Sequence, residues 1–217
     1  MSHNLKQIKI NRHPIMWVSN IINSYISAGI LSEATSLSFS KYRYIPHSYI
    51  DNRINFSLSI NQLNNEFLLN ELIELNEGEE LAFHSEIYSN GIKYHLPLID
   101  FGGKDYRFIE SPTRAFSNYW EMDFSIFNSG RSYHAYGHKI LTTQNWIKFM
   151  GSLLLINSPG SARIIDDRWI GHRLMAEYAA LRWSKNSSQY KKFPTYFGHL
   201  NSNGLFHHMD IDERKNM

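Results

Sequence analysis

Three short segments of the sequence carry side chains that could act together on one substrate. The first is an apolar run that ends in Asp100, and the second contains Ser132 and His134, which point to the same face if they lie on a strand. The third, residues 163–184, combines acids with bases: Asp166, Asp167, Arg168, His172, Arg173 and Arg182. Carboxylates bind hard cations such as Mg²⁺ or Mn²⁺, and the arginine fork binds phosphate oxygens. The three segments together are therefore suited to phosphoryl transfer.

Each segment taken singly also has a simpler interpretation. An Asp at the end of a strand is more often a turn or cap residue, and a lone His within a strand is usually structural. An Arg beside an Asp commonly forms an ion pair. The order of the three segments and their surroundings make the set more specific than its parts.

The charge of the chain is unevenly distributed. The whole sequence has a formal net charge of +2, but residues 131–192 hold ten Lys or Arg against three Asp or Glu, a net charge of +7. Residues 1–90 hold six basic and nine acidic residues, a net charge of −3. A basic half on a nearly neutral protein is typical of a polyanionic ligand such as a nucleotide or a nucleic acid. An ordinary solvated face explains it equally well.

Composition excludes several classes of protein. The 217 residues contain no cysteine, which excludes a disulfide scaffold, a zinc–cysteine site, an iron–sulfur cluster and a thiol nucleophile. No run of about 18 apolar residues is present, so we expect no transmembrane helix and no membrane partner. The polar first residues lack the apolar stretch of a signal peptide, so we expect a cytoplasmic protein.

Hydrophobic periodicity predicts a mixture of helices and strands. Helical spacing is found in residues 14–31, 61–80 and 142–156. Strand-like patterns occur in 35–60, 80–89, 92–101, 119–130, 131–139, 162–166 and 180–184. Asn90-Gly91 predicts a tight hairpin turn between two of these strands. The residues after Gly103 form a polar stretch. The pattern predicts an α+β fold with a mainly antiparallel central sheet flanked by helices. We expect residues 1–90 to pack on or complete that sheet, residues 91–217 to form the core, and both to belong to one continuous globular unit.

The three segments resemble, in order, the motifs of the archaeo-eukaryotic primase superfamily, the catalytic core of primases and primase-polymerases. The sequence SGRSYHAYG resembles the Ser-x-His motif through Ser132 and His134, and IIDD resembles the third motif through Asp166 or Asp167. The downstream HRL and LRWS resemble the basic segment that contacts nucleotide. The resemblance covers residues 92–186 and implies the primase catalytic fold, with Asp100, Asp166 and Asp167 as catalytic residues and metal ligands. It implies nucleotide binding by Arg131, Ser132, His134, Arg168, His172, Arg173 and Arg182.

The first motif departs from the family pattern. That motif usually has two acids separated by one residue, whereas Asp100 is followed by Phe101 and Gly102. The acids Asp105, Glu110 and Asp123 lie nearby in sequence, but none has the required spacing. A two-metal site needs several carboxylates, so a reduced or catalytically inactive family member is an open alternative.

The resemblance implies a nucleotidyltransferase that uses Mg²⁺ or Mn²⁺ to synthesise or extend a DNA or RNA primer on a template. Its partners would be nucleoside triphosphates, single-stranded or primed nucleic acid, and a helicase or another complex subunit, in replication, repair, defence or a mobile element. The first alternative is a catalytically degenerate primase-fold module that binds nucleotide or nucleic acid within a larger complex. The second is a metal-dependent nuclease or phosphoesterase, which is less favourable because residues 92–186 contain no His-x-Asp or Asp-His pair.

Overall fold

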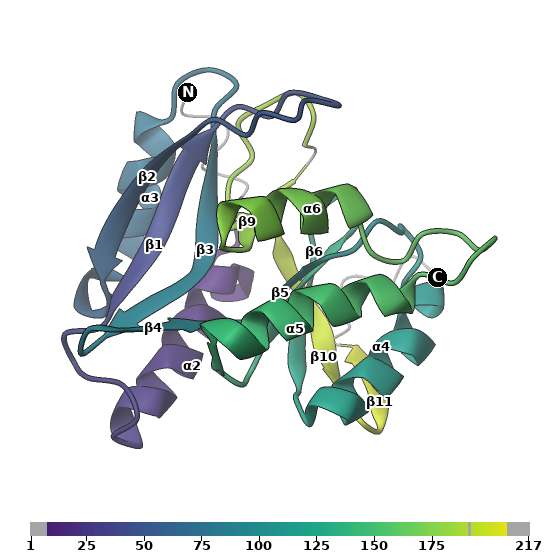
Figure 1. Ribbon diagram of the computed structural model, residues 1–217. Helices are drawn as coiled ribbons and strands as arrows, with labels where there is room; N and C mark the ends of the chain where they lie inside the picture. Colours follow the sequence, from purple (N-terminus) through teal and green to yellow (C-terminus); the bar gives the residue numbers. More distant parts are fainter. Residues whose placement is uncertain (1–7, 191, 208–217) are drawn as a thin grey trace, which may run out of the picture.

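A computed structural model describes residues 8–190 and 192–207, in which the strands form two antiparallel sheets (Figure 1). The first sheet has the order β2 (Arg53–Ser59), β1 (Ser36–Tyr42), β3 (Glu80–Ser89), β4 (Ile92–His95) and β8 (Leu141–Thr142), and β9 (Ala180–Arg182) also pairs with β3. The second sheet has the order β11 (Gly204–His207), β10 (Thr195–Asn201), β6 (Phe124–Asn128), β7 (Tyr133–Gly137) and β5 (Leu98–Asp100). The predicted α+β class with antiparallel strands is confirmed, although the strands divide between two sheets instead of forming one.

The helices of the described residues begin at residues whose side chains cap the first turn. The α-helices are α2 (Pro14–Ser27), α3 (Asn65–Glu74), α4 (Tyr106–Trp120), α5 (Thr143–Leu153) and α6 (Asp167–Ala176), with short 3₁₀ turns η1 (Ile10–Arg12), η2 (Ile60–Gln62) and η3 (Leu154–Ile156). Asn64 and Thr142 accept hydrogen bonds from backbone N–H groups of α3 and α5, as good N-cap residues do. Helices α2, α3 and α5 lie within the three segments for which the apolar spacing predicts a helix.

The hairpin between β3 and β4 turns at Asn90 and Gly91, as predicted. Their φ angles of 50° and 75° lie in the left-handed region that a type I′ turn requires. The predicted boundary between residues 90 and 91 falls at this turn, and the division of the chain there stays a prediction.

Two helices, α4 and α6, were not predicted. The polar stretch after Gly103 forms α4, in which Asp105 caps the first turn and Ile109, Thr113 and Phe116 are buried on one face. The predicted strand 162–166 was wrong: its backbone makes only the isolated bridge between Ile165 and Phe101, and α6 begins directly afterwards. The interior Pro112 weakened the helical signal of α4.

A shared hydrophobic core holds the two sheets together. Trp183, just after β9, stacks on Phe83 of β3 with ring centroids 5.0 Å apart. Its indole Nε1 donates a 2.9 Å hydrogen bond to the hydroxyl of Tyr136 on β7. β9 also contacts β5 of the second sheet, and its last residue, Arg182, therefore lies near Asp100 at the end of β5. Within the described residues, no helix is both long and apolar enough to cross a membrane.

Candidate active site

A cleft of about 340 Å³ is lined by residues from both sheets, from α6 and from the loop between β1 and β2. Nine of the ten site residues that the sequence predicts line it: Asp100, Arg131, Ser132, His134, Asp166, Arg168, His172, Arg173 and Arg182. They come from segments separated by as many as 82 positions, so the fold brings together three distant stretches of the chain. Asp167 is the exception.

Strand pairing places Asp100 beside His134. The two residues are direct partners in the β5–β7 ladder, and directly opposed residues of an antiparallel pair project from the same face. Nε2 of His134 lies 3.7 Å from Oδ1 of Asp100. Ser132 stands just before β7 at the rim of the cleft, 3.3 Å from the hydroxyl of Ser129.

Asp166 reaches the cleft from a helix N-terminus and not from a strand end. Its Oδ1 accepts hydrogen bonds from the backbone N–H groups of Arg168 and Trp169 and caps α6. Its own N–H donates to the carbonyl of Asp100 at 3.2 Å, which fixes the two aspartates side by side. The neighbouring Asp167 instead pairs with Arg163 at 2.9 Å, outside the cleft lining. The resemblance left open whether Asp166 or Asp167 is the acid of the third motif, and Asp166 is the one that lines the cleft.

The electrostatic environment perturbs the two groups at the centre of the cleft. Burial raises the pKa of Asp100 to about 8, and the nearby carboxylate of Asp166 adds to the rise, while Arg182 and Arg131 oppose it. Burial holds the pKa of His134 well below its usual range, and the positive charge of Arg182 lowers it further. His134 is therefore a neutral imidazole at pH 7.

Two buried arginines form the positively charged wall of the cleft. Arg182 is 4% exposed; it donates from Nη2 to the carbonyl of Ser129 at 2.6 Å and stacks on Tyr190 with 3.9 Å between the guanidinium carbon and the ring centre. Arg173 is 2% exposed and donates from Nη2 to Asp51. Nε of both residues and Nη1 of Arg173 have no hydrogen-bond partner within the described part of the chain. Buried unpaired N–H groups are costly, so an anionic ligand in the cleft would stabilise them.

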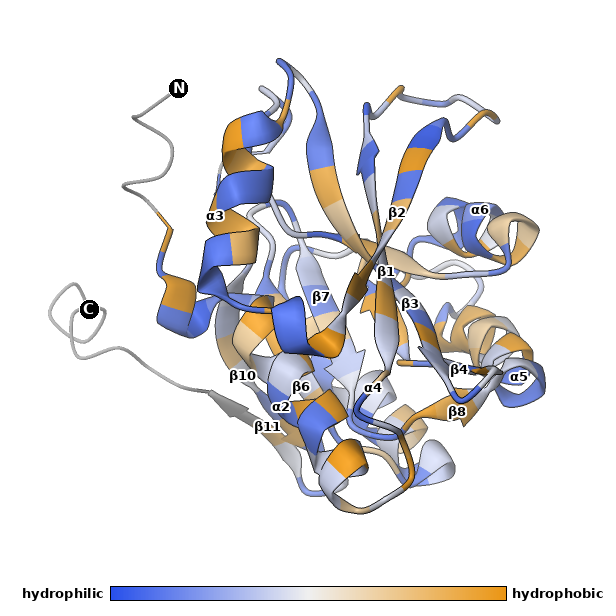
Figure 2. Cartoon of the chain, turned by 90° about the vertical axis from the view of Figure 1, so that its left-hand side faces the viewer, coloured by the Kyte–Doolittle hydropathy of each residue, from blue (hydrophilic) through white to orange (hydrophobic). Residues whose placement is uncertain are grey.

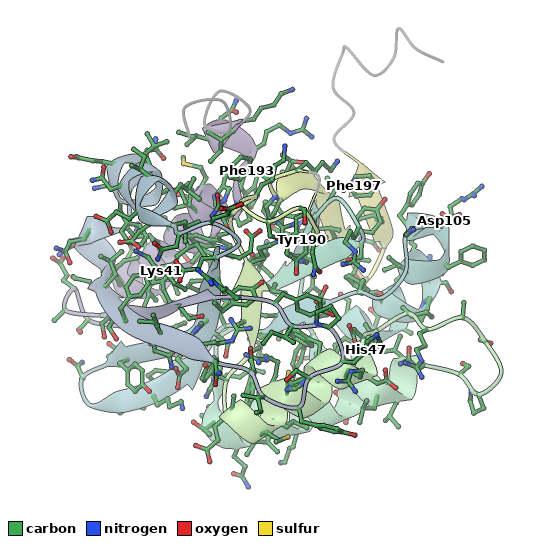
Figure 3. All side chains as sticks on the ribbon, turned by 90° about the horizontal axis from the view of Figure 1, so that it is seen from above. Lys41, His47, Asp105, Tyr190, Phe193 and Phe197 are labelled. Carbon is green, nitrogen blue, oxygen red and sulfur yellow. The ribbon has the colours of Figure 1, made fainter. Side chains whose placement is uncertain are left out.

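The cleft also contains residues that the sequence did not single out. Asp51 and Arg53, from the β1–β2 loop and the start of β2, pair at 2.8 Å, and Asp51 also accepts from Arg173. Tyr190 is visible from above in Figure 3, where it is labelled. No signal in the sequence could have found Asp51, because its partner Arg173 lies 122 positions away and the pairing has no local spacing pattern.

The three acids considered as substitutes in the first motif lie elsewhere. Asp105 caps α4 and pairs with Arg107, Glu110 accepts a hydrogen bond from the backbone of β11, and Asp123 contacts His199. None of them lines the cleft.

Asp100 and Asp166 are the two adjoining carboxylates of the cleft that could hold a divalent cation. In the described residues no group of three or more His, Asp or Glu side chains has the arrangement of a metal cage. Asp100 and Asp166 nevertheless adjoin each other, and their mutual repulsion is the kind that a cation relieves. Mg²⁺ at nucleotide sites is commonly held by one or two protein carboxylates, with water and substrate phosphates completing the shell. The donor set therefore fits a single Mg²⁺ or Mn²⁺ carried with a phosphate ligand.

Comparison with known families identifies a family for this chain. The family model described as AEP-like, archaeo-eukaryotic primase 1D-like, matches residues 59–195, more than half of the chain. The match spans the cleft residues from Asp100 to Tyr190 and leaves out the β1–β2 loop. No curated protein and no solved structure matches the chain. With the family match over most of the fold that builds the cleft, the chain belongs to the AEP-like family of archaeo-eukaryotic primase 1D-like proteins.

Proposed function

We propose that the cleft binds a nucleoside triphosphate and that the protein is a nucleotidyltransferase that synthesises or extends a primer on a nucleic-acid template. The observation that carries this proposal is the meeting of Asp100 and Asp166 in one cleft with buried, incompletely paired arginines. Phosphoryl transfer requires little covalent chemistry from the protein. It depends on positioning and on charge stabilisation, which carboxylates and guanidinium groups supply.

Asp100 and Asp166 are the residues that would hold a Mg²⁺ or Mn²⁺ ion. Such an ion supplies charge neutralisation at the phosphate oxygens. Without a cation, the high pKa of Asp100 keeps this carboxyl largely protonated at pH 7. Binding of a cation would accordingly release a proton, and cation affinity would rise with pH.

The remaining residues of the cleft would bind the triphosphate. Arg182 and Arg173 supply fixed positive charge at the base of the cleft, and Arg131 supplies it at the rim. The neutral imidazole of His134 has an unpaired Nδ1 and lies next to Asp100, so it would donate a hydrogen bond to a phosphate oxygen. In this role His134 binds substrate and transfers no proton.

Incorporation of labelled nucleotides on a primed template with Mn²⁺ tests the proposal. We expect incorporation by the unmodified protein and its loss in Asp100→Ala, because the site would lose one of its two carboxylates. Asp123→Ala is the matched control, since Asp123 is an exposed carboxylate outside the cleft lining. Equal incorporation by Asp100→Ala and the unmodified protein would place the activity elsewhere and overturn the proposal.

A second candidate is a primase-fold module that binds nucleotide or nucleic acid without turnover. The specific observation in its favour is the small number of carboxylates: of the three that line the cleft, Asp51 is already paired with two arginines. Triphosphate binding that depends on Arg182 and Arg173, with no incorporation under any divalent cation, would select this candidate.

A further inference from the structure

The loop between β1 and β2, residues 43–52, forms one rim of the cleft, and the proposed function assigns it no contact with substrate. It rises above α6 in two perpendicular views (Figures 1 and 2), and Figure 3 looks down on it, with His47 labelled. His47 has a φ angle of 61°, in the left-handed region of a tight turn. The loop precedes the segment that the family model matches, so the family match assigns nothing to it.

Polar contacts hold this loop against α6. Asp51 pairs with both Arg53 and Arg173, and Nη2 of Arg168 donates to the carbonyl of Ser48 at 3.1 Å. Within the loop, the Ser48 hydroxyl accepts from the backbone N–H of Ile50 at 2.9 Å. The loop is thus fixed in position relative to the cleft at two points, Ser48 and Asp51.

Large apolar and aromatic side chains of the loop are exposed. Tyr44 is 46% exposed and Tyr49 is 82% exposed, and Ile45 and Ile50 are exposed beside them. Figure 2 accordingly shows both hydrophobic and hydrophilic residues along the loop. None of these four side chains contributes to the core. Tyr44 lines the cleft and Tyr49 lies beside Arg168, so both exposed rings are suited to contact a ligand.

Cations lie among the exposed tyrosines. Arg43 is adjacent to Tyr44 and lines the cleft, and the guanidinium of Arg168 lies 5.7 Å from the centre of the Tyr49 ring. Exposed aromatic rings interleaved with positive charge are the combination that binds single-stranded nucleic acid, because bases stack on the rings while cations bind the backbone. A purely apolar protein partner would instead leave Arg43 and Arg168 buried without acidic partners.

We propose that residues 43–52 are a stacking platform for a single-stranded nucleic acid: Tyr44 and Tyr49 stack on its bases, and Arg43 and Arg168 bind its phosphates. This inference rests on the proposed function, because it locates the path of the polymer substrate beside the cleft. Because the platform adjoins the cleft through Arg168, a strand bound on it would enter the cleft beside Asp166.

Fluorescence anisotropy with a labelled oligothymidylate of about 20 nucleotides, measured at several salt concentrations, tests the platform. We expect the double variant Tyr44→Ala/Tyr49→Ala to bind roughly 10- to 100-fold more weakly at every salt concentration, with an unchanged salt dependence, because stacking releases no counterions. The double variant Tyr44→Phe/Tyr49→Phe should retain the affinity. Arg43→Ala should instead reduce the slope of log affinity against log salt by about 0.7.

Tyr119→Ala is the matched control, because Tyr119 is 76% exposed on α4 and lies outside the lining of the cleft. Affinity of the Tyr44→Ala/Tyr49→Ala variant equal to that of Tyr119→Ala would overturn the platform. A fluorescent ATP analogue separates this failure from that of the proposed function: if the unmodified protein binds the analogue, only the platform is lost. If it binds neither the analogue nor the oligonucleotide, both proposals fail.

Discussion

Replacement of Asp100 by Asn should change how the stability of the protein depends on pH. In the folded protein the pKa of Asp100 is about 8, against an ordinary value of 3.8. Between these values the folded state keeps a proton that the unfolded state has released, so the free energy of unfolding falls as pH rises from about 4 to about 8. Above pH 8 the folded state has released this proton as well, and the full free-energy cost of burying the charged carboxylate is present. The neutral Asn carries no such penalty, so Asp100→Asn should gain stability relative to the unmodified protein as pH rises.

The size of the effect follows from the shift and the exposure of the side chain. A rise of about four pKa units corresponds to at most about 6 kcal/mol. Because 27% of the Asp100 side chain is exposed, water screens part of this, and we expect about 2–3 kcal/mol. The buried histidines His13 and His95, whose pKa values burial lowers to about 4, titrate in both proteins and cancel in the comparison.

Urea denaturation at pH 5, 7 and 9, first without divalent cations and then with Mn²⁺, measures this difference. The gap between Asp100→Asn and the unmodified protein should widen from pH 5 to pH 9, and Mn²⁺ at pH 9 should narrow it by stabilising only the unmodified protein. Asp123→Asn, which removes a carboxylate outside the cleft, controls for the general loss of negative charge. Parallel pH profiles for Asp100→Asn and the unmodified protein would show that folding does not raise the pKa of Asp100.

Three further outcomes are expected. His134→Ala should raise the KM for the nucleotide by about 10-fold and change kcat much less, because one hydrogen bond to a charged group is lost. Steady-state kinetics measure both constants, and an unchanged KM with a reduced kcat would indicate proton transfer instead. Asp166→Asn, which keeps a capping side chain, should lower incorporation by about 10²–10³-fold, whereas Asp167→Asn should leave it near normal; equal effects in the same assay would contradict the placement of Asp167 outside the cleft. Gly137→Ala should destabilise the protein by about 1–3 kcal/mol, since the added Cβ would lie 2.4 Å from Sδ of Met122. Urea denaturation measures this, and an unchanged midpoint would show that β7 has room for the methyl group.

The strand-borne part of the site could be predicted from sequence because strands have a period of two. That rule predicts one face for Ser132 and His134, and both line the cleft, although Ser132 lies just before the first residue of β7. The apolar run before Asp100 marks the end of a buried strand. The pairing of Asp100 with His134 is set by the order of the strands, which only the fold supplies.

The helix-borne part could not be predicted in the same way. Residues 162–166 read as a strand that ends in acids, but Asp166 is a helix cap, and the signal that would have shown this is its N-cap position before the buried Ile170 and Arg173. The contact of Arg173 with Asp51 depends on how α6 packs against the β1–β2 loop, and no local pattern encodes such packing.

A crystal structure with a non-hydrolysable nucleoside triphosphate and Mn²⁺ would show whether the cleft around Asp100 and Asp166 binds metal and nucleotide together. We expect an anomalous Mn²⁺ peak at the carboxylates of Asp100 and Asp166, with triphosphate oxygens bound by Arg182 and the imidazole of His134. A triphosphate bound outside this cleft, or a Mn²⁺ ion that contacts neither aspartate, would contradict this expectation.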